Sequence, residues 1–299
     1  MGFLAYRRCL VGLVMAAGLS RPVSAGDDPK GVACGSTPGE VSLHVVVEQS
    51  PTQAANTKTS RCIEFELYFD CAHAPITFEE SVLFEGTFQI IGEVHRTISI
   101  PVPSNPICMT ARDPLHTLRS CYTFEPDDCD EDGVLHADFV GDPFFGGNWL
   151  VNGNLDGNLH SPFAGHDVID ILDFAHLVPQ FLAELGDGSS PCGTKRPHAD
   201  VNGDGWVDQL DYSFISINFF ETSEECCCPN VSTLGNTTRR FRVTNQWLRR
   251  GGMCELTVAD LNNDQVVDLS DMAALLQGVR PGTPPAPCPL EINDDVYRP

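Results

Sequence analysis

The chain has 299 residues, which is more than one typical domain and predicts two folded units with short extra segments. Its formal net charge is −23 at pH 7, because 41 acidic residues stand against 18 basic ones. A basic surface supplies most of the affinity for nucleic acids and for anionic membranes, so this composition argues against both kinds of partner.

The first 25 residues have the pattern of a secretory signal peptide. Arg7 and Arg8 precede an apolar run from Cys9 to Leu19, and Val23-Ser24-Ala25 offers small residues for cleavage. A membrane anchor is the alternative, but the run is shorter than the roughly 20 residues that span a bilayer. We therefore expect a secreted protein, extracellular or at the cell surface. The mature chain should have no transmembrane segment and should begin with a linker, residues 26–40.

The cysteine content also favours an oxidising compartment. Of the 13 cysteines, only Cys9 lies in the signal segment, which leaves an even number divided equally before and after residue 150. Each half is expected to close its own disulfides, with the pairing left open. Adjacent cysteines rarely meet disulfide geometry with one another, so we expect Cys226, Cys227 and Cys228 to pair with Cys192, Cys254 and Cys288. A thiolate metal cluster is the alternative, although the segment has no C-x-x-C pair.

Residues 41–148 are predicted to form a disulfide-bonded antiparallel β-sandwich, with a barrel as the alternative. Apolar and polar residues alternate in "VSLHVVV" from Val41 and in "CIEFELYF" from Cys62. Further strand-like runs are "GTFQII", "RTISIPV", "LHTLRSCYTF" and "VLHADFV", with Pro, Gly, Asn and Asp between them. One apolar face of each strand is expected to form the core.

No familiar catalytic motif is present in the sequence, which contains no G-x-S-x-G, no H-E-x-x-H and no glycine-rich phosphate loop. Arg112, Asp113 and His116 in "ARDPLHTL" form one compact polar group. We interpret them as a structural Arg/Asp pair beside a turn, with a catalytic role as the alternative. Glycoside hydrolysis needs two carboxylates whose separation is set by the fold, so the sequence leaves that activity open.

Three acidic clusters follow, and each is compared with a calcium loop of the EF-hand type. Such a loop takes ligands from positions 1, 3, 5, 7, 9 and 12 and has glycine at position 6. The first cluster lies in a predicted dockerin-like region, residues 149–221, and matches with an insertion after position 5. Its candidate ligands are Asn154, Asp156, Asn158, Asp170 and Asp173, with Val168 at position 7. Calcium binding and a vestigial loop held by its own hydrogen bonds both remain open here.

The second cluster meets the pattern at each position, except that position 12 is Asp where the EF-hand has Glu. Its candidate ligands are Asp200, Asn202, Asp204, Trp206 (through the main-chain carbonyl), Asp208 and Asp211, with Gly205 at position 6. Ligands that are all oxygens suit a hard ion with flexible coordination, which favours Ca²⁺ over Mg²⁺ or a transition metal. A solvated acidic turn is the alternative.

Residues 222–255 are predicted to be a Cys-rich connector with a helix at "TNQWLRR", and residues 256–280 carry the third cluster. Its candidate ligands are Asp260, Asn262, Asp264, Val266, Asp268 and Asp271. Position 6 is Gln265, and a side chain resists the left-handed backbone needed there, so this copy is expected to be strained or looser. Residues 281–299 are expected to be a tail.

The first and third clusters run directly into segments with helical spacing. Apolar residues after Asp173 and after Asp271 recur at i, i+3, i+4 and i+7, as in a helix with one buried face. Pro179 predicts a kink or an early end of the first of these helices. No segment with helical spacing leads into the Asp200 loop, so this arrangement differs from a complete EF-hand.

The loops "DVNGDGWVDQLD" and "DLNNDQVVDLSD", with the helices behind them, resemble the duplicated calcium segments of dockerin domains. These are secreted bacterial modules that bind cohesins in cellulosome-type assemblies. The resemblance implies calcium-dependent folding, with Asp211 and Asp271 as position-12 ligands, and a cohesin-like protein or extracellular scaffold as partner. Positions 10 and 11, often Ser or Thr in cellulosomal dockerins, are Ile171-Leu172, Gln209-Leu210 and Leu269-Ser270 here.

The expected architecture is therefore multidomain β plus α, an N-terminal antiparallel β-sandwich followed by a small α-helical dockerin-like region. The leading functional prediction is a secreted, non-catalytic calcium-binding protein that attaches to a protein partner or extracellular complex. In one alternative, the sandwich is a carbohydrate-binding or polysaccharide-degrading module anchored by the same region. This alternative rests only on the association of the resembled family with such modules. A cell-envelope adhesion protein is the second alternative.

Overall fold

The structure is a computed structural model that describes residues 34, 39–49, 57–86, 90–100, 105–156, 168–195, 198–223, 239–286 and 288. The predicted signal peptide, most of the predicted linker and tail, Asn158, and the cysteines at 226–228 lie outside these residues. Within the described segments, every helix is too short or too polar to cross a lipid bilayer.

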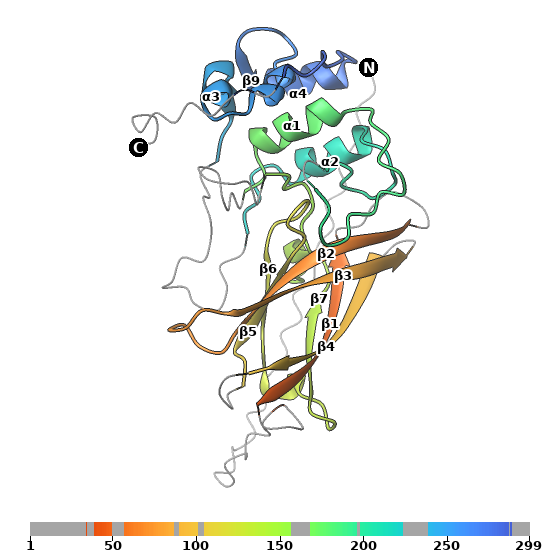
Figure 1. The fold of residues 1–299 in the computed structure, drawn as a ribbon, viewed down its shortest axis with the longest axis vertical. Coiled ribbons are helices and arrows are strands. Elements are labelled where there is room, and N and C mark those ends of the chain that lie inside the picture. Colours follow the sequence, from red (N-terminus) through yellow and green to blue (C-terminus); the bar gives the residue numbers. More distant parts are fainter. Residues whose placement is uncertain are drawn as a thin grey trace, which may run out of the picture. The chain divides into compact units, whose positions relative to one another are not determined.

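Seven strands of the described chain build one sheet, drawn in Figure 1. They are β1 (Glu40–Gln49), β2 (Thr57–Tyr68), β3 (Ile76–Gly86), β4 (Ile90–Ser99), β5 (Cys108–Arg112), β6 (Ser120–Thr123) and β7 (Val134–Phe139). Their order across the sheet is β6-β5-β2-β3-β4-β1-β7. The edge strands β6 and β7 contact each other, so the sheet is nearly closed. The described chain is thus mostly β, in line with the sequence.

One strand pair departs from the antiparallel arrangement that we predicted. Neighbouring strands in this sheet pair antiparallel, except that β7 runs parallel to β1, with His44 opposite His136. A parallel pair cannot be joined by a tight hairpin and needs a long connection. Here the whole β2–β6 portion of the sheet intervenes between the two strands, which lets β7 return in the direction of β1.

The predicted alternation in the first two strands is confirmed. Val41, Leu43, Val45 and Val47 of β1 are buried, as are Ile63, Phe65 and Leu67 of β2. These side chains belong to one apolar cluster inside the sheet. A period of two residues places alternate side chains on one face of a strand, so the pattern itself indicates which face is covered.

Other strand predictions need correction. "GTFQII" and "RTISIPV" contribute to one strand, β4, while "LHTLRSCYTF" is a strand only at β6. The strands β3 and β5 were not predicted. In β3 the consecutive acidic residues Glu79 and Glu80 obscure the period, and Cys108 to Ala111 of β5 are buried on both faces, which removes the alternation.

The C-terminal half of the described chain contains short helices around a second apolar cluster. The elements are α1 (Ile171–Leu177), α2 (Gln209–Ile217), β8 (Arg242–Thr244), α3 (Asn245–Arg250), β9 (Val266–Asp268) and α4 (Leu269–Leu276), with 3-10 turns at Val178–Gln180 and Cys254–Ala259. Two further 3-10 turns, Pro126–Asp128 and Pro143–Phe145, belong to the N-terminal half. The helix expected at "TNQWLRR" is α3, and Thr244 caps it by accepting a hydrogen bond from the Trp247 amide. As Pro179 predicts, α1 ends early, at Leu177.

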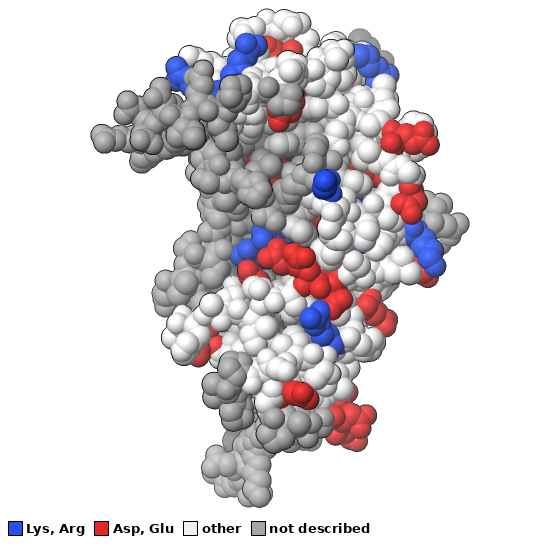
Figure 2. All heavy atoms as spheres, viewed as in Figure 1, with Lys and Arg blue, Asp and Glu red and all other residues white. Residues whose placement is uncertain are grey.

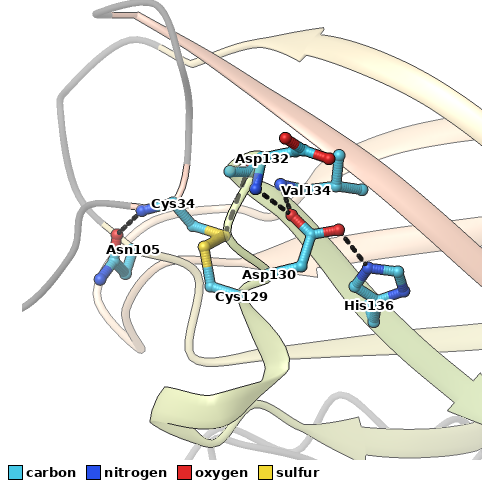
Figure 3. The surroundings of a disulfide bond; sticks show 8 residues. Cys34, Asn105, Cys129, Asp130, Asp132, Val134 and His136 are labelled. Carbon is cyan, nitrogen blue, oxygen red and sulfur yellow. Dashed lines mark hydrogen bonds and ion pairs between the residues drawn. A yellow bond between two sulfur atoms is a disulfide. The ribbon is translucent and has the colours of Figure 1, made fainter.

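The disulfides correct the expectation that each half closes its own bonds. Cys62 of β2 is bonded to Cys192, which crosses between the halves, and Cys254 is bonded to Cys288. The pairing of Cys192, Cys254 and Cys288 with the triple cysteine is therefore wrong. Cys34 is bonded to Cys129, as Figure 3 shows, and Cys71, Cys108 and Cys121 are also disulfide-bonded. Sequence alone missed the Cys62–Cys192 bond because segment 189–192 lies along β2, where Ser190 exchanges main-chain hydrogen bonds with Ser60 and Cys62.

Charged side chains are interspersed on the surface. On the face drawn in Figure 2, the described basic side chains lie apart from one another among acidic ones and form no continuous basic patch.

Candidate functional site

The loop that begins at Asp200 is organised by the carboxylates at its two ends. Asp200 accepts hydrogen bonds from the amides of Gly203 (2.8 Å), Asp204 (3.2 Å) and Gly205 (2.8 Å). Asp211 accepts hydrogen bonds through Oδ1 from the amides of Val201 (2.7 Å) and Asn202 (3.0 Å). Through Oδ2 it accepts one from the amide of Asp208 (2.8 Å). The first and twelfth positions thus close the loop on itself, and both carboxylates are buried.

Between these ends, alternate residues bond to the main chain two positions ahead. The Asn202 side chain accepts from the Asp204 amide, and the Asp204 side chain accepts from the Trp206 amide, each at 2.9 Å. Gly205 has φ +90°, and a Cβ placed on it would lie 2.3 Å from the carbonyl oxygen of Gly186. Position 6 therefore needs glycine both for its left-handed backbone and for the space it leaves.

The loop that begins at Asp260 repeats this frame. Asp260 accepts from the amides of Asp264 and Gln265, each at 2.9 Å. Asp271 accepts from the amides of Leu261 (2.7 Å), Asn262 (3.1 Å) and Asp268 (2.9 Å). Gln265 has φ +72°, as the strain argument from the sequence requires.

The first cluster has the same closing carboxylate. Asp173 accepts from the amides of Leu155 (2.6 Å) and Asp156 (3.2 Å) through Oδ1 and from the amide of Asp170 (2.7 Å) through Oδ2. Asn154, Asp156, Asp170 and Asp173 are all buried. The structure therefore brings together the two parts of this cluster on either side of the insertion, while Asn158 lies outside the described residues.

Each closing pair of carboxylates also starts a helix. The aspartates at position 9 (Asp170, Asp208 and Asp268) are the N-caps of α1, α2 and α4, and those at position 12 are the third helical residues. In all three helices, the side chain of the N-cap Asp accepts a hydrogen bond from the main-chain amide of the position-12 Asp, and the position-12 side chain accepts one from the main-chain amide of the N-cap Asp. This reciprocal pair is a capping box with Asp in both places. The geometry of each loop thus determines where its helix begins.

Burial of several carboxylates close together raises their proton affinity. Burial raises the pKa of Asp211 to about 7, and the nearby charge of Asp200 adds to this effect. Burial also raises the pKa of Asp200 and of Asp271, and raises that of Asp173 well above its ordinary value with help from Asp156 and Asp170. A bound cation would favour the charged forms and so reverse these shifts.

The donors in the loops fit calcium. All the candidate side-chain ligands are carboxylates or amides, and Trp206 and Val266 offer main-chain carbonyls, so the set is made of oxygens. Oxygen-rich sets of carboxylates, carbonyls and water are those that Ca²⁺ takes, whereas Zn²⁺ prefers nitrogen and sulfur. Whether ions bind to the individual residues stays a prediction from the spacing.

A buried arginine lies directly behind the Asp200 loop, and it was missed by the sequence analysis. Arg61 of β2 has no exposed surface, and its guanidinium donates to the main-chain carbonyls of Asp200 (2.9 Å) and Val201 (3.2 Å). It also donates to the Ser190 hydroxyl (3.1 Å) and lies 2.8 Å from His116. The sequence around position 61 contains no signal that this charge turns inward, because the partners of Arg61 are distant in the chain.

The predicted Arg112–Asp113 pair is wrong. Arg112 pairs with Glu64 (2.9 Å), whose strand β2 lies beside β5. Asp113 is buried and instead bonds to His116 (2.8 Å). Burial opposes the charge of Asp113, but the attraction of His116, their hydrogen bond and the charge of Arg61 together hold its pKa below the ordinary value. Through Arg61, this cluster is connected to the main chain of the Asp200 loop.

Comparisons with known proteins give little further information. No known protein family and no curated protein match the sequence. Among solved structures, one similar chain comes from the crystal structure of a type II cohesin–X-dockerin complex from Acetivibrio cellulolyticus, with 9% sequence identity and a TM-score of 0.34. The match covers 61% of this chain and 97% of that one. A TM-score of this size does not show a shared fold.

Proposed function

We propose that this chain is a secreted, non-catalytic calcium-binding protein whose dockerin-like segments attach it to a protein partner. The observation that carries the calcium part is the repeated frame of hydrogen bonds. In three separate segments, an aspartate at position 12 accepts from the amides at positions 2, 3 and 9 and so closes an oxygen-lined loop. Secretion is supported by the signal-like first 25 residues and by the disulfides.

Calcium would act on the fold through the carboxylates. The ion supplies positive charge that offsets the repulsion among them and replaces the water they lose on burial. Asp200, Asn202, Asp204, Asp208 and Asp211 would hold it, together with the Trp206 carbonyl. The helix α2 that follows buries Tyr212, Phe214 and Ile215, so a stable loop positions an apolar face. Binding free energy then contributes to folding free energy.

Native mass spectrometry of the mature chain tests this proposal by counting calcium ions. We expect two or three ions in calcium buffer, and one fewer in an Asp211→Asn variant that keeps the size of the side chain. A matched Asp187→Asn variant changes an exposed carboxylate outside the three loops and should retain the wild-type count. A wild-type protein that binds no calcium contradicts the proposal.

The attachment part is supported by apolar side chains left exposed on α4. Leu269 and Leu276 are each about half exposed, and Leu269 occupies position 10 of its loop, one of the two positions that dockerins present to cohesins. Exposed apolar groups that lie together favour a contact with another protein.

A panel of purified cohesin modules tests the attachment directly. We expect binding in calcium, loss of binding in EDTA, and loss in a Leu269→Asp, Leu276→Asp double variant. Leu83→Asp on β3 is the matched control, because Leu83 is similarly exposed but lies on the sheet. If no cohesin binds in calcium, the cohesin assignment is wrong, while the calcium assignment is tested separately by the ion count.

Glycan binding is a second candidate, favoured by one cavity. A cavity of about 610 Å³ is lined by the aromatic residues Phe144 and Trp149 and by the carboxylates Asp142 and Glu221. Aromatic faces with polar groups beside them suit a sugar ring. A polysaccharide pull-down with wild-type protein and Trp149→Ala tests this function, and release of reducing sugar would show hydrolysis instead. A wild-type protein that no polysaccharide retains contradicts glycan binding, and equal retention of both proteins contradicts the cavity as the site.

A further inference from the structure

Three histidines form a row on the outer face of the sheet, across the adjacent strands β4, β1 and β7. His44 of β1 lies opposite His95 of β4 and opposite His136 of β7. His44 stands between the core residues Leu43 and Val45, and His136 between Leu135 and Ala137, so both point away from the core. The ring of His95 stacks on that of His44 and so lies on the same face. No local pattern in the sequence predicts this row, because the register of distant strands brings the three residues together.

The side chains in this row contact one another and two carboxylates. The rings of His44 and His95 are stacked with their centroids 4.3 Å apart, and His44 Nδ1 lies 3.1 Å from His136 Nδ1. Glu93 Oε2 lies 3.7 Å from His44 Nε2 and 4.0 Å from His95 Nε2. The ligand atoms of His44, Glu93 and His95 all lie within 4.8 Å of one another.

The carboxylate of Asp130 determines which nitrogens carry protons. Asp130 accepts from the amides of Asp132 (3.0 Å) and Val134 (2.8 Å) and from His136 Nε2 (2.9 Å), next to the Cys34–Cys129 disulfide, as Figure 3 shows. The hydrogen bond from His136 and those from the two amides favour the ionised form of Asp130, which accepts only. A neutral His136 that donates through Nε2 must accept through Nδ1.

The tautomer of His136 in turn determines that of His44. Since His136 accepts through Nδ1, His44 donates through its own Nδ1, and the proton of neutral His44 is used in that bond. Its Nε2 therefore carries a lone pair. This atom is buried and makes no hydrogen bond in the described structure. It faces Glu93 and His95, so a nitrogen lone pair that can bind a metal lies beside a carboxylate and a second imidazole.

We propose that His44, Glu93 and His95 form a surface site for Zn²⁺, with His136 and Asp130 as positioning residues that hold His44 in the tautomer that binds metal. Two imidazoles and a carboxylate are a common set of protein ligands for this ion, with water in the fourth place. A hydrogen-bonded histidine or carboxylate behind a ligating histidine is the usual support for such a site.

The site differs from the acidic loops in its donors. Two of its three ligand atoms are imidazole nitrogens, which suit borderline ions such as Zn²⁺, while the loops offer oxygen to a hard ion. Ligands of one tetrahedral zinc ion lie about 3.3 Å apart, given Zn–N distances near 2.0 Å. The ligand atoms here lie farther apart, at 3.7 Å and 4.0 Å for the two pairs with Glu93. The side chains must move closer, and the parallel rings of His44 and His95 must tilt for both lone pairs to meet one ion. The His95 side chain is 71% exposed and can make this movement.

Isothermal titration calorimetry with zinc chloride tests the proposal. The mature wild-type chain is titrated at neutral pH in saturating calcium, so that the acidic loops are filled. We expect one equivalent to bind, and the dissociation constant to rise about tenfold or more in His95→Ala and in Glu93→Gln. His73→Ala is the matched control, because His73 is an exposed histidine paired with Asp70 away from the row, and it should bind as wild type does.

Asp130→Asn tests the positioning role. The amide can still accept from the main chain but no longer favours the proton on His136 Nε2. The ¹⁵N chemical shifts of His44 should then show loss of the Nδ1–H tautomer, with zinc affinity lowered about tenfold at an unchanged melting temperature. Zinc binding that is absent in the wild type, or that His95→Ala and His73→Ala lower equally, would overturn the proposed site. An unchanged His44 tautomer in Asp130→Asn would overturn the positioning role.

Discussion

The Asp200 and Asp260 loops share one hydrogen-bond frame and differ in what covers them. In the Asp200 loop, Asn202, Gly203 and Gly205 are buried, whereas Asn262, Asn263 and Gln265 at the same positions of the Asp260 loop are exposed. A Cβ on Gly203 would lie 3.0 Å from Arg61 and from Thr59 of β2, and one on Gly205 would meet segment 186–188. The covered loop therefore needs its glycines, while the uncovered loop accommodates left-handed Asn263 and Gln265.

The two loops also differ in the elements that support them. The main chain of Asp200 is held by Arg61, which belongs to the sheet, whereas Asp260 receives a hydrogen bond from the Asn245 side chain at the start of α3 (2.7 Å). One loop is thus coupled to the sheet and the other to a neighbouring helix. The same twelve-residue pattern can then have different stability at its two sites, and single substitutions can measure this difference.

Removing the first carboxylate should have the largest effect, and more so at the covered loop. Asp200→Ala removes an ion ligand and the acceptor of three main-chain amides, two of which belong to the buried Gly203 and Gly205. We therefore expect a loss of about 4 kcal/mol of unfolding free energy in saturating calcium. Asp260→Ala should cost about 2 kcal/mol, because its surroundings are wetter. Urea unfolding of both variants measures the difference, and equal losses would contradict the comparison.

Asp113→Asn should weaken the support of the covered loop alone. The variant removes the buried carboxylate that pairs with His116 and lies near Arg61, which costs about 3 kcal/mol at neutral pH. The folded-state pKa of Asp113 is lowered, so its contribution is fully present above its unfolded pKa of about 3.9 and is lost as the pH falls through the lower folded value.

Urea unfolding at neutral pH and below pH 3.9 provides the measurement for Asp113. The gap in stability between wild type and variant should shrink in acid, and the hydrogen exchange of α4 amides should not change. A gap that stays constant with pH would show that the charge of Asp113 does not matter to the fold.

Gly205→Ala should destabilise by about 2 kcal/mol, through the left-handed backbone and the contact with Gly186. Calcium affinity at this loop should fall with it. Thermal unfolding and calcium titration should be measured for this variant and for Gln265→Ala. In Gln265→Ala, one side chain replaces another at a left-handed position, so stability and calcium affinity should change little. A Gly205→Ala variant as stable as wild type would show that the loop is not covered as described.

Gln265→Gly is the reverse change and should be the smallest. It relieves a left-handed residue in an exposed loop and should stabilise by about 1 kcal/mol, with tighter calcium binding at the third cluster. The free energy of unfolding measured in urea checks this. A loss of stability would mean that the Gln265 side chain contributes contacts that outweigh its strain.

Local patterns predicted a good part of this molecule. The aspartates at positions 9 and 12 are three residues apart, which is the spacing of a capping box, so the loop pattern also marks where α2 and α4 begin. The alternation of apolar and polar residues around Val45 and Phe65 likewise indicates which side chains of these strands are buried. What escaped prediction depends on pairs far apart in sequence. Strand register and packing bring together Arg61 with Asp200, Cys62 with Cys192, and His44 with His95 and His136. The local periodicity of the sequence does not indicate such contacts.

Calorimetry of the mature chain with calcium and with EDTA tests the central claim most directly. If cations hold the carboxylate-rich loops together, free calcium at about a thousand times its dissociation constant adds about 4 kcal/mol to the free energy of unfolding for each occupied site. The melting temperature should then fall by roughly 10 °C in EDTA for a chain of this size. The same melting temperature in both buffers would contradict the account, because it would mean that the loops fold as well on their own hydrogen bonds.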